Sequence, residues 1–322
     1  MARDFFLRLV FLVTFAGIAN AQTYPTQTVR IVVPFPPGGG VDILIRAVAA
    51  ELTPKWGKPV IIENKAGAGS MIGAEAVARA EPDGHTLMAT VNPTLTANRF
   101  LYKSLPYDPD RSFAPVTLMV QADQYLVAHS SVKANDLREF VALAKREKGK
   151  LNFGSYAPGS QPHLLYGLLN KREGLDLVHV PYKGIAPVMQ AVSTGEVHVT
   201  AGSSSVAGAM MKDGRIKPLA LAGKKRSAQF PDVPTTIEQG YPYLQAPIWY
   251  ALFAPAKTPA AIVTKINADV AAILKTPAFA EKQVTSRGLD VVASTPEELA
   301  QVIREEVEVT GEMIKAVGIQ PE

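Results

Sequence analysis

Cysteine is absent from this chain of 322 residues. Its absence excludes a thiol nucleophile, a disulfide bond, a cysteine-ligated zinc ion and an iron–sulfur cluster. Clustered positive charge is missing as well, because 33 scattered lysines and arginines stand against 29 aspartates and glutamates, with a net charge of +4. A nucleic-acid-binding protein would concentrate its basic residues on one face or segment. We therefore expect no nucleic acid as a partner.

A hydrophobic run long enough to cross a membrane is also missing, since about 20 apolar residues are needed. The N-terminal apolar run, residues 9–18, has no charge and follows Arg3 and Arg8. Residues 19–21 read Ala-Asn-Ala, with small side chains at both ends. This order is typical of a secretory signal peptide and its cleavage site. We predict that residues 1–21 are removed on export to a bacterial periplasm, which suits a protein without cysteine.

Apolar residues make up 47% of the chain, which is enough for one large core or two ordinary ones. Short apolar runs alternate with helix-patterned stretches. In the first unit, residues 29–35 are predicted to form a strand, residues 36–40 a loop and residues 41–52 a helix. The alternation restarts beyond about residue 123. This order predicts an α/β fold of two lobes, each a mostly parallel sheet flanked by helices.

The C-terminal segment is predicted to be mostly helical. A capping box at residues 295–298 opens its last helix, and residues 289–294 form a single strand. One strand cannot make a lobe, so we expect this segment to pack on the first lobe. The predicted organisation is residues 22–122 with 246–322 in the first lobe and residues 123–245 in the second.

Glycine-rich loops between a strand and a helix are the most informative local feature. They are residues 36–42, 67–73 and 154–160. Glycine allows left-handed backbone and close approach of a ligand, and each helix N-terminus offers unpaired N–H groups to an anion. Two such termini from the first lobe facing one from the second would suit a carboxylate. Steric demands of a tight turn explain any single loop equally well, so the loops alone do not identify a ligand.

Catalytic patterns are weak in this sequence. Residues 67–73 approximate a dinucleotide fingerprint, but the glycine spacing differs and no acidic residue follows at the required distance. The five histidines form no zinc-protease pair, and no Gly-x-Ser-x-Gly motif is present. We therefore predict no cofactor and no metal. One enzymatic alternative stays open: an exported hydrolase or lyase using His163 with Ser155 or Ser160.

A series of short motifs runs through nearly the whole predicted mature chain. The motifs are Tyr24-Pro25, Val33-Pro34-Phe35-Pro36-Pro37-Gly38-Gly39-Gly40 with Asp42, Glu63-Asn64 with Gly67-Ala68-Gly69, Ile72-Gly73-Ala74-Glu75, Pro82-Asp83-Gly84, His163-Leu164, Val180-Pro181-Tyr182-Lys183-Gly184, Val233-Pro234-Thr235 and Trp249 with Ala254-Pro255. In this order they resemble the Bug family, the TctC-like periplasmic solute receptors of tripartite tricarboxylate transporters. The resemblance implies a two-lobed periplasmic-binding-protein fold of the Venus-flytrap type, with the ligand between the lobes.

The resemblance also implies which residues line the cleft. They are Phe35, Gly39, Asp42, Gly69, Ser70 and Thr90 in the first lobe, with Ser155, Ser160, His163 and Tyr182 in the second. Two positions depart from the family pattern and bear on ligand identity. Ser70 stands where the family more often has glycine, and His198 replaces the aspartate usual after the Gly-x-Val step.

The function that the resemblance implies is binding without catalysis. The mature protein is expected to act as a monomer that captures a small carboxylate, such as a di- or tricarboxylate, an amino acid or an aromatic acid. It would deliver this ligand to the inner-membrane subunits of a tripartite tricarboxylate transporter. A receptor that presents its ligand to a sensor protein instead would have the same sequence features.

Overall fold

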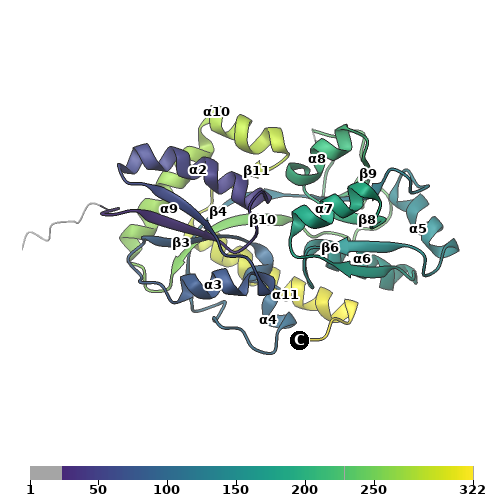
Figure 1. The fold of residues 1–322 in the computed structure, drawn as a ribbon, viewed down its shortest axis with the longest axis horizontal. Helices are drawn as coiled ribbons and strands as arrows, with labels where there is room; N and C mark the ends of the chain where they lie inside the picture. The colour runs from purple at the N-terminus through teal and green to yellow at the C-terminus, as the bar shows by residue number, and fades with distance from the viewer. Residues whose placement is uncertain (1–23, 228, 322) are drawn as a thin grey trace, which may run out of the picture.

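A computed structural model describes residues 24–227 and 229–321 of the chain. The signal peptide predicted at residues 1–21 lies outside the described residues. The described chain folds into two lobes that lie side by side, each built on one β-sheet with helices on both faces (Figure 1). This confirms the α/β fold class.

The first lobe contains a sheet in which the described strands follow the order β11-β4-β10-β3-β1-β2. The strands are β1 (Val29–Val33), β2 (Val60–Asn64), β3 (Thr86–Val91), β4 (Phe113–Ala122), β10 (Ile248–Pro255) and β11 (Asp290–Val291). The sheet is mixed, and not mostly parallel as the sequence predicted. β1 pairs in parallel with β2 and β3, whereas β10, which returns from the second lobe, runs antiparallel to both β3 and β4.

Helices cover both faces of this first sheet. They are α2 (Gly40–Trp56) and α9 (Ala260–Lys275) on one face, with α3 (Met71–Ala78) and α11 (Pro296–Val317) on the other. Successive side chains of a strand point to opposite faces. Accordingly Ile31 and Val33 of β1 pack with α2 and α9, while Val32 packs with α3. The apolar run of β1 is therefore buried on both sides, as the sequence predicts.

The second lobe contains a sheet in which the described strands follow the order β7-β6-β8-β5-β9. The strands are β5 (Gln124–His129), β6 (Asn152–Ser155), β7 (Val178–Pro181), β8 (Val199–Gly202) and β9 (Ile216–Ala222). This sheet is also mixed, with β6 parallel to β7 and β8, and β5 antiparallel to β8 and β9.

Four helices cover the second sheet within the described residues. They are α5 (Leu137–Arg146) and α6 (Gln161–Glu173) on one face, and α7 (Ile185–Thr194) and α8 (Ser204–Lys212) on the other. The side chains of β5 alternate between the two faces, with Leu126 beside α5 and α6 and Val127 beside α7 and α8.

The chain passes between the sheets twice, at two places close to the boundary between the lobes. Asp123 alone separates β4 from β5, and residues 223–247 connect β9 to β10. The second connection packs on the second lobe, where the Gln239 amide donates to the Leu219 carbonyl oxygen at 2.9 Å. Both connections therefore lie at the boundary between the lobes.

The C-terminal helix α11 contacts both lobes. Leu299 and Ile303 near its start belong to the core of the first lobe. A Thr295 to Glu298 capping box opens this helix, which confirms the sequence prediction. Its far end reaches α6, where a Cβ added at Gly167 would lie 2.8 Å from Val317. In Figure 1 the yellow α11 accordingly extends from beneath the first lobe toward the second.

A search of the described residues finds no helix with both the length and the apolar character required to cross a membrane.

Candidate ligand-binding site

A cavity lies between the two lobes. Its volume is about 60 Å³, which gives room for roughly four water molecules. Loops of both lobes and the first residue of β5 form its wall. The lining residues are Phe35, Pro36, Pro37, Gly39, Gly40, Val41, Val91, Gln124, Tyr156, Gly184, Ile185, Ala186, Pro187, Gly202, Ser203, Val206, Ile248 and Tyr250.

Three helices begin at this cavity: α2 from the first lobe, and α7 and α8 from the second. Their N-caps are Gly39, Gly184 and Ser203, and none makes a side-chain capping hydrogen bond. The Ser203 hydroxyl instead pairs with the Ser205 hydroxyl at 2.7 Å. The first N–H groups of a helix have no partner within the helix, and the macrodipole adds positive potential there. Anions are therefore favoured at this point between the lobes.

The arrangement of the helix N-termini differs from the one predicted. The sequence suggested two termini from the first lobe facing one from the second, at residues 36–42, 67–73 and 154–160. Residues 36–42 line the cavity and residues 154–160 contribute Tyr156, whereas residues 67–73 do not reach it; the other two helix starts come from residues 184–187 and 202–206. The difference arises because the pairing of loops between the lobes is set by strand order and by the crossings between the two sheets, which local sequence does not encode.

Gly40 allows the start of α2 to approach the far wall of the cavity. A Cβ at this position would clash with the Tyr250 hydroxyl oxygen and would lie 3.1 Å from the Ser205 hydroxyl oxygen. The contact with Tyr250 is too short for any side chain. Glycine is therefore required here by close packing, whereas a Cβ at Gly39 would meet only Ile185, at 3.8 Å.

The polar side chains of the cavity wall are neutral. Burial raises the pKa values of Tyr156 and Tyr250, so both keep their protons. Among the lining residues that the structure describes, no side chain carries a charge. Any anion held here would be stabilised by backbone N–H groups and neutral donors.

Two of the residues predicted for the site, Phe35 and Gly39, line the cavity. Asp42 lies in the first turn of α2, where its buried carboxylate accepts hydrogen bonds from the Gly38 amide at 3.0 Å and from Asn64 at 2.9 Å. Burial alone would raise the pKa of Asp42, but hydrogen bonds from Arg46, Gly38 and Asn64 lower it below its usual value. Asp42 therefore fixes the loop that leads into α2.

Gly69, Ser70 and Thr90 lie outside the cavity wall and join a separate cluster in the first lobe. Thr94 donates to the Ser70 hydroxyl at 2.9 Å and pairs with the Thr90 hydroxyl at 2.7 Å. Asn98 donates to the Gly69 carbonyl oxygen at 2.9 Å. The hydroxyl of Ser70, which the sequence singled out, is therefore used to attach its loop to the segment after β3.

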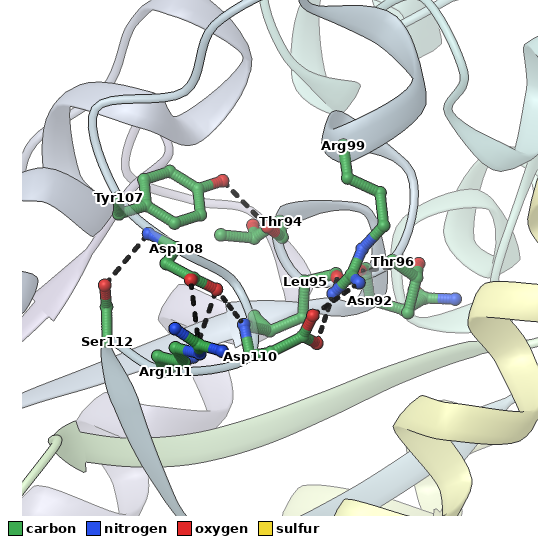
Figure 2. A network of polar contacts seen from close by, with 10 residues as sticks. All are labelled: Asn92, Thr94, Leu95, Thr96, Arg99, Tyr107, Asp108, Asp110, Arg111 and Ser112. Carbon is green, nitrogen blue, oxygen red and sulfur yellow. Dashed lines mark hydrogen bonds and ion pairs between the residues drawn. The ribbon is translucent and has the colours of Figure 1, made fainter.

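That segment, residues 92–112, is itself held by a network of polar contacts (Figure 2). Tyr107 donates to the Thr94 carbonyl oxygen at 2.8 Å. Arg99 bridges the segment by pairing with both carboxylate oxygens of Asp110, at 2.8 and 2.9 Å. The network holds the chain after β3 in one conformation, which positions Asn92 at its start.

In the second lobe, Ser155 and His163 contact other groups of their own lobe. The Ser155 hydroxyl pairs with His179 Nε2 at 2.7 Å, and His163 Nδ1 accepts from the Gly159 amide at 3.1 Å. The two imidazole rings stack with centroids 3.9 Å apart. Burial lowers the pKa of His163 to about 3 and that of His179 to about 4, so both rings are neutral at ordinary pH.

Ser160 and Tyr182 also have protein partners. The Ser160 hydroxyl donates to the Ala157 carbonyl oxygen at 2.7 Å, and the Tyr182 hydroxyl donates to Glu196 at 2.7 Å. Ser155 and Ser160 are each fully buried. Neither hydroxyl is placed to attack a substrate in the cavity.

A network of hydrogen bonds beside the cavity joins the two lobes. Gln161 of α6 donates to Asn92 Oδ1 at 2.8 Å and accepts a hydrogen bond from the Tyr156 hydroxyl. Asn92 in turn donates to Glu306 of α11 at 2.5 Å, and Trp249 donates to the other carboxylate oxygen of Glu306 at 2.5 Å. Burial raises the pKa of Glu306. This interlobe network links the cavity wall at Tyr156 to the C-terminal helix.

Several cavity residues were missed by sequence reasoning, above all Gln124, Ser203 and Tyr250. The loops before α7 and α8 have the same strand-glycine-helix order as residues 36–42, so that pattern could have predicted them. Gln124 and Tyr250 lie at or near the start of β5 and β10, the strands that follow the two crossings between the lobes. Nothing in their immediate sequence distinguishes them from ordinary strand residues.

Comparison with known proteins assigns the chain to a family. Residues 44–319 match the family described as the tripartite tricarboxylate transporter family receptor, TctC. The protein BugT of Bordetella pertussis is 32% identical, in an alignment that covers 96% of this chain and 95% of BugT.

Two solved structures extend the comparison. The periplasmic binding protein BugD superposes with a TM-score of 0.87 at 31% identity, covering 93% of this chain and all of BugD. MatC from Rhodopseudomonas palustris, solved with bound malate, superposes with a TM-score of 0.84 at 34% identity, covering 90% of this chain and all of MatC. These relatives are solute-binding receptors and not enzymes, so the hydrolase or lyase alternative does not hold. The chain belongs to the tripartite tricarboxylate transporter receptor family, the Bug or TctC-like solute-binding receptors.

Proposed function

We propose that this protein is a periplasmic receptor that captures a small carboxylate between its lobes. The proposal is carried by one observation, the meeting of the N-termini of α2, α7 and α8 at a cavity without charged lining. Backbone N–H groups and helix dipoles favour an anion, while Phe35, Ile185 and Val206 provide apolar contact for its carbon chain. The bound malate of MatC supports the same ligand class.

Binding would act by holding the lobes together. The ligand would contact α2 in the first lobe and α7 and α8 in the second, so its affinity is greater for the closed arrangement than for an open one. A ligand shifts a conformational balance only by this difference in affinity. The crossings at Asp123 and residues 223–247 would serve as the hinge. We propose Phe35 and Gly39 as ligand contacts. The other residues that the sequence predicted for the site would support the loops around the cavity.

The proposed partners are the inner-membrane subunits of a tripartite tricarboxylate transporter, which would accept the ligand from the closed, monomeric receptor. The family match supports this assignment. Uptake of a labelled carboxylate by cells with and without the receptor tests it. Loss of a transcriptional response with unchanged uptake would instead indicate a receptor that serves a sensor.

Thermal unfolding of the mature protein with a panel of mono-, di- and tricarboxylates, amino acids and aromatic acids tests ligand capture. A carboxylate at about 100 times its Kd should add roughly 2.7 kcal/mol to the free energy of unfolding. Absence of any shift across the panel would contradict carboxylate binding.

A matched pair of variants locates the site. Val206→Asp introduces a negative charge at the start of α8, where it should repel an anion and weaken binding at least tenfold. Val178→Asp makes the same change at a position that is 51% exposed on β7 of the same lobe, and it should leave affinity unchanged. Equal affinity of the two variants would place the ligand elsewhere.

A further inference from the structure

Gln124 occupies an unusual position in the cavity wall. It is the first residue of β5, immediately after the crossing at Asp123, and its backbone pairs with Ala222 at the end of β9. It therefore lies where both connections between the lobes approach each other. The residue is only 1% exposed, and it lines the cavity.

The side-chain amide nitrogen of Gln124 is buried and has no hydrogen-bond partner among the residues that the structure describes. More than nine in ten buried polar groups in proteins are paired. Removal of a donor from water without a replacement partner destabilises the folded chain. A water molecule or a ligand in the cavity can supply the missing acceptor.

The other polar side chains of the wall already have partners. The hydroxyl of Tyr156 donates to Gln161, Ser203 pairs with Ser205, and the hydroxyl of Tyr250 lies 3.5 Å from Ser205. Gln124 makes no such contact: among the described lining residues, its amide nitrogen is the buried side-chain donor without a partner. Around it the wall is apolar, with Val91 on the first lobe and Ile248 on β10.

The cavity therefore offers two kinds of donor. The starts of α2, α7 and α8 provide backbone N–H groups suited to one carboxylate. The amide of Gln124 provides a neutral N–H donor, and the acceptor it requires is an oxygen. A ligand that satisfies both carries a second oxygen group beyond its first carboxylate.

We infer that Gln124 is a specificity-determining residue that donates a hydrogen bond to the second carboxylate of a short dicarboxylate. This inference rests on the proposed function, since it assumes that the first carboxylate binds at the helix N-termini. It makes the site selective for a dicarboxylate over the monocarboxylate of the same length. In that monocarboxylate a methyl group replaces the acceptor, and the amide of Gln124 stays unpaired.

Calorimetric titration with two matched ligand pairs tests the inference. The pairs are succinate with butyrate and malate with 2-hydroxybutyrate, and the members of each pair differ only by a carboxylate in place of a methyl group. The unmodified protein should bind the dicarboxylate of at least one pair tenfold or more tightly than its partner. Gln124→Met, which keeps the length of the side chain and removes the donor, should abolish this preference by weakening dicarboxylate binding alone.

Two further variants complete the experiment. Gln121→Met makes the same change at an exposed position three residues earlier and should retain the preference. Gln124→Glu replaces the donor with a negative charge and should weaken dicarboxylates more than Gln124→Met does. The melting temperature of unliganded Gln124→Met should equal or exceed that of the unmodified protein, because an unpaired buried donor has been removed.

The outcomes separate this inference from the proposed function. If the unmodified protein binds the dicarboxylates and Gln124→Met weakens both members of a pair equally, the role of Gln124 is refuted while carboxylate capture stands. A melting temperature of Gln124→Met well below that of the unmodified protein would show a structural role and would also overturn the inference. If the unmodified protein binds none of the four probes, carboxylate capture and the inference fail together.

Discussion

Replacing Gln161 by leucine should open the receptor and weaken ligand binding. In the structure the Gln161 side chain joins the lobes by donating to Asn92 Oδ1 at 2.8 Å, and it also accepts a hydrogen bond from the Tyr156 hydroxyl of its own lobe. Leucine is similar in size and makes neither hydrogen bond. In the closed arrangement it would leave two buried polar atoms without partners, whereas in an open arrangement water can reach both.

The magnitude follows from these two atoms. An unsatisfied buried polar group costs about 1–3 kcal/mol, so the closed arrangement should lose at least about 2 kcal/mol relative to the open one. Each 1.4 kcal/mol corresponds to a tenfold change in an equilibrium constant. If ligand binding requires closure, the Kd should therefore rise by about 30-fold. Other contacts between the lobes, such as Ser204 with the Arg287 carbonyl oxygen at 2.5 Å, remain in the variant.

Calorimetric titration measures the Kd. The ligand is malate or the carboxylate of the panel that raises the melting temperature most. Small-angle X-ray scattering of the unliganded protein should show a larger radius of gyration for Gln161→Leu. Gln190→Leu changes an exposed glutamine of α7 in the same lobe and serves as the control. A Kd within threefold of that of the unmodified protein, with unchanged scattering, would refute a role of Gln161 in closure.

Three further predictions concern stability. Gly40→Ala should lower the melting temperature, because its Cβ would clash with the Tyr250 hydroxyl oxygen. Gly39→Ala should not, because the nearest neighbour of its Cβ would be 3.8 Å away; equal melting temperatures of the two variants would contradict this packing. Burial raises the pKa of Asp123 to about 6 from 3.8, so the folded state holds its proton more tightly and stability falls as the pH rises from about 4 to 6. The Asp123→Asn variant should lose this pH dependence and should be more stable than the unmodified protein at pH 7 by about 1 kcal/mol, a figure reduced because Asp123 is partly exposed to solvent. Denaturant titrations at pH 4 and pH 7 measure both effects. Burial lowers the pKa of His163 to about 3 from 6.5, so the stabilising contribution of the neutral ring is complete above pH 6.5 and decreases as the pH falls. Between pH 7 and 5 the free energy of unfolding should fall by about 2 kcal/mol on account of this residue. His163→Asn should remove this part of the pH dependence in the same titrations.

Local features of the fold were predictable from the sequence. The apolar run of β1, the loop at residues 36–42 and the helix behind it have the expected order, because a strand or helix is specified by residues within a few positions of each other. The capping box at Thr295 and Glu298 was predictable for the same reason. The serial motifs were also sufficient to identify the family, which the comparison confirms.

The composition of the cavity was decided by the tertiary structure. Local sequence cannot show which loops of one lobe face those of the other. Residues 67–73 were expected at the cavity and lie outside its wall, residues 154–160 contribute Tyr156, and residues 184–187 and 202–206 line it without having been predicted.

Long-range partners were likewise invisible in the sequence. Asn92 and Glu306 are 214 positions apart and meet only because α11 packs against the segment after β3. Whether a hydroxyl or amide is free for a ligand depends on such partners, which occupy the hydroxyls of Ser70 and Ser155 and leave the amide nitrogen of Gln124 unpaired. The sequence thus determined the elements and the family, while the packing of the two lobes decided which donors remain for a ligand.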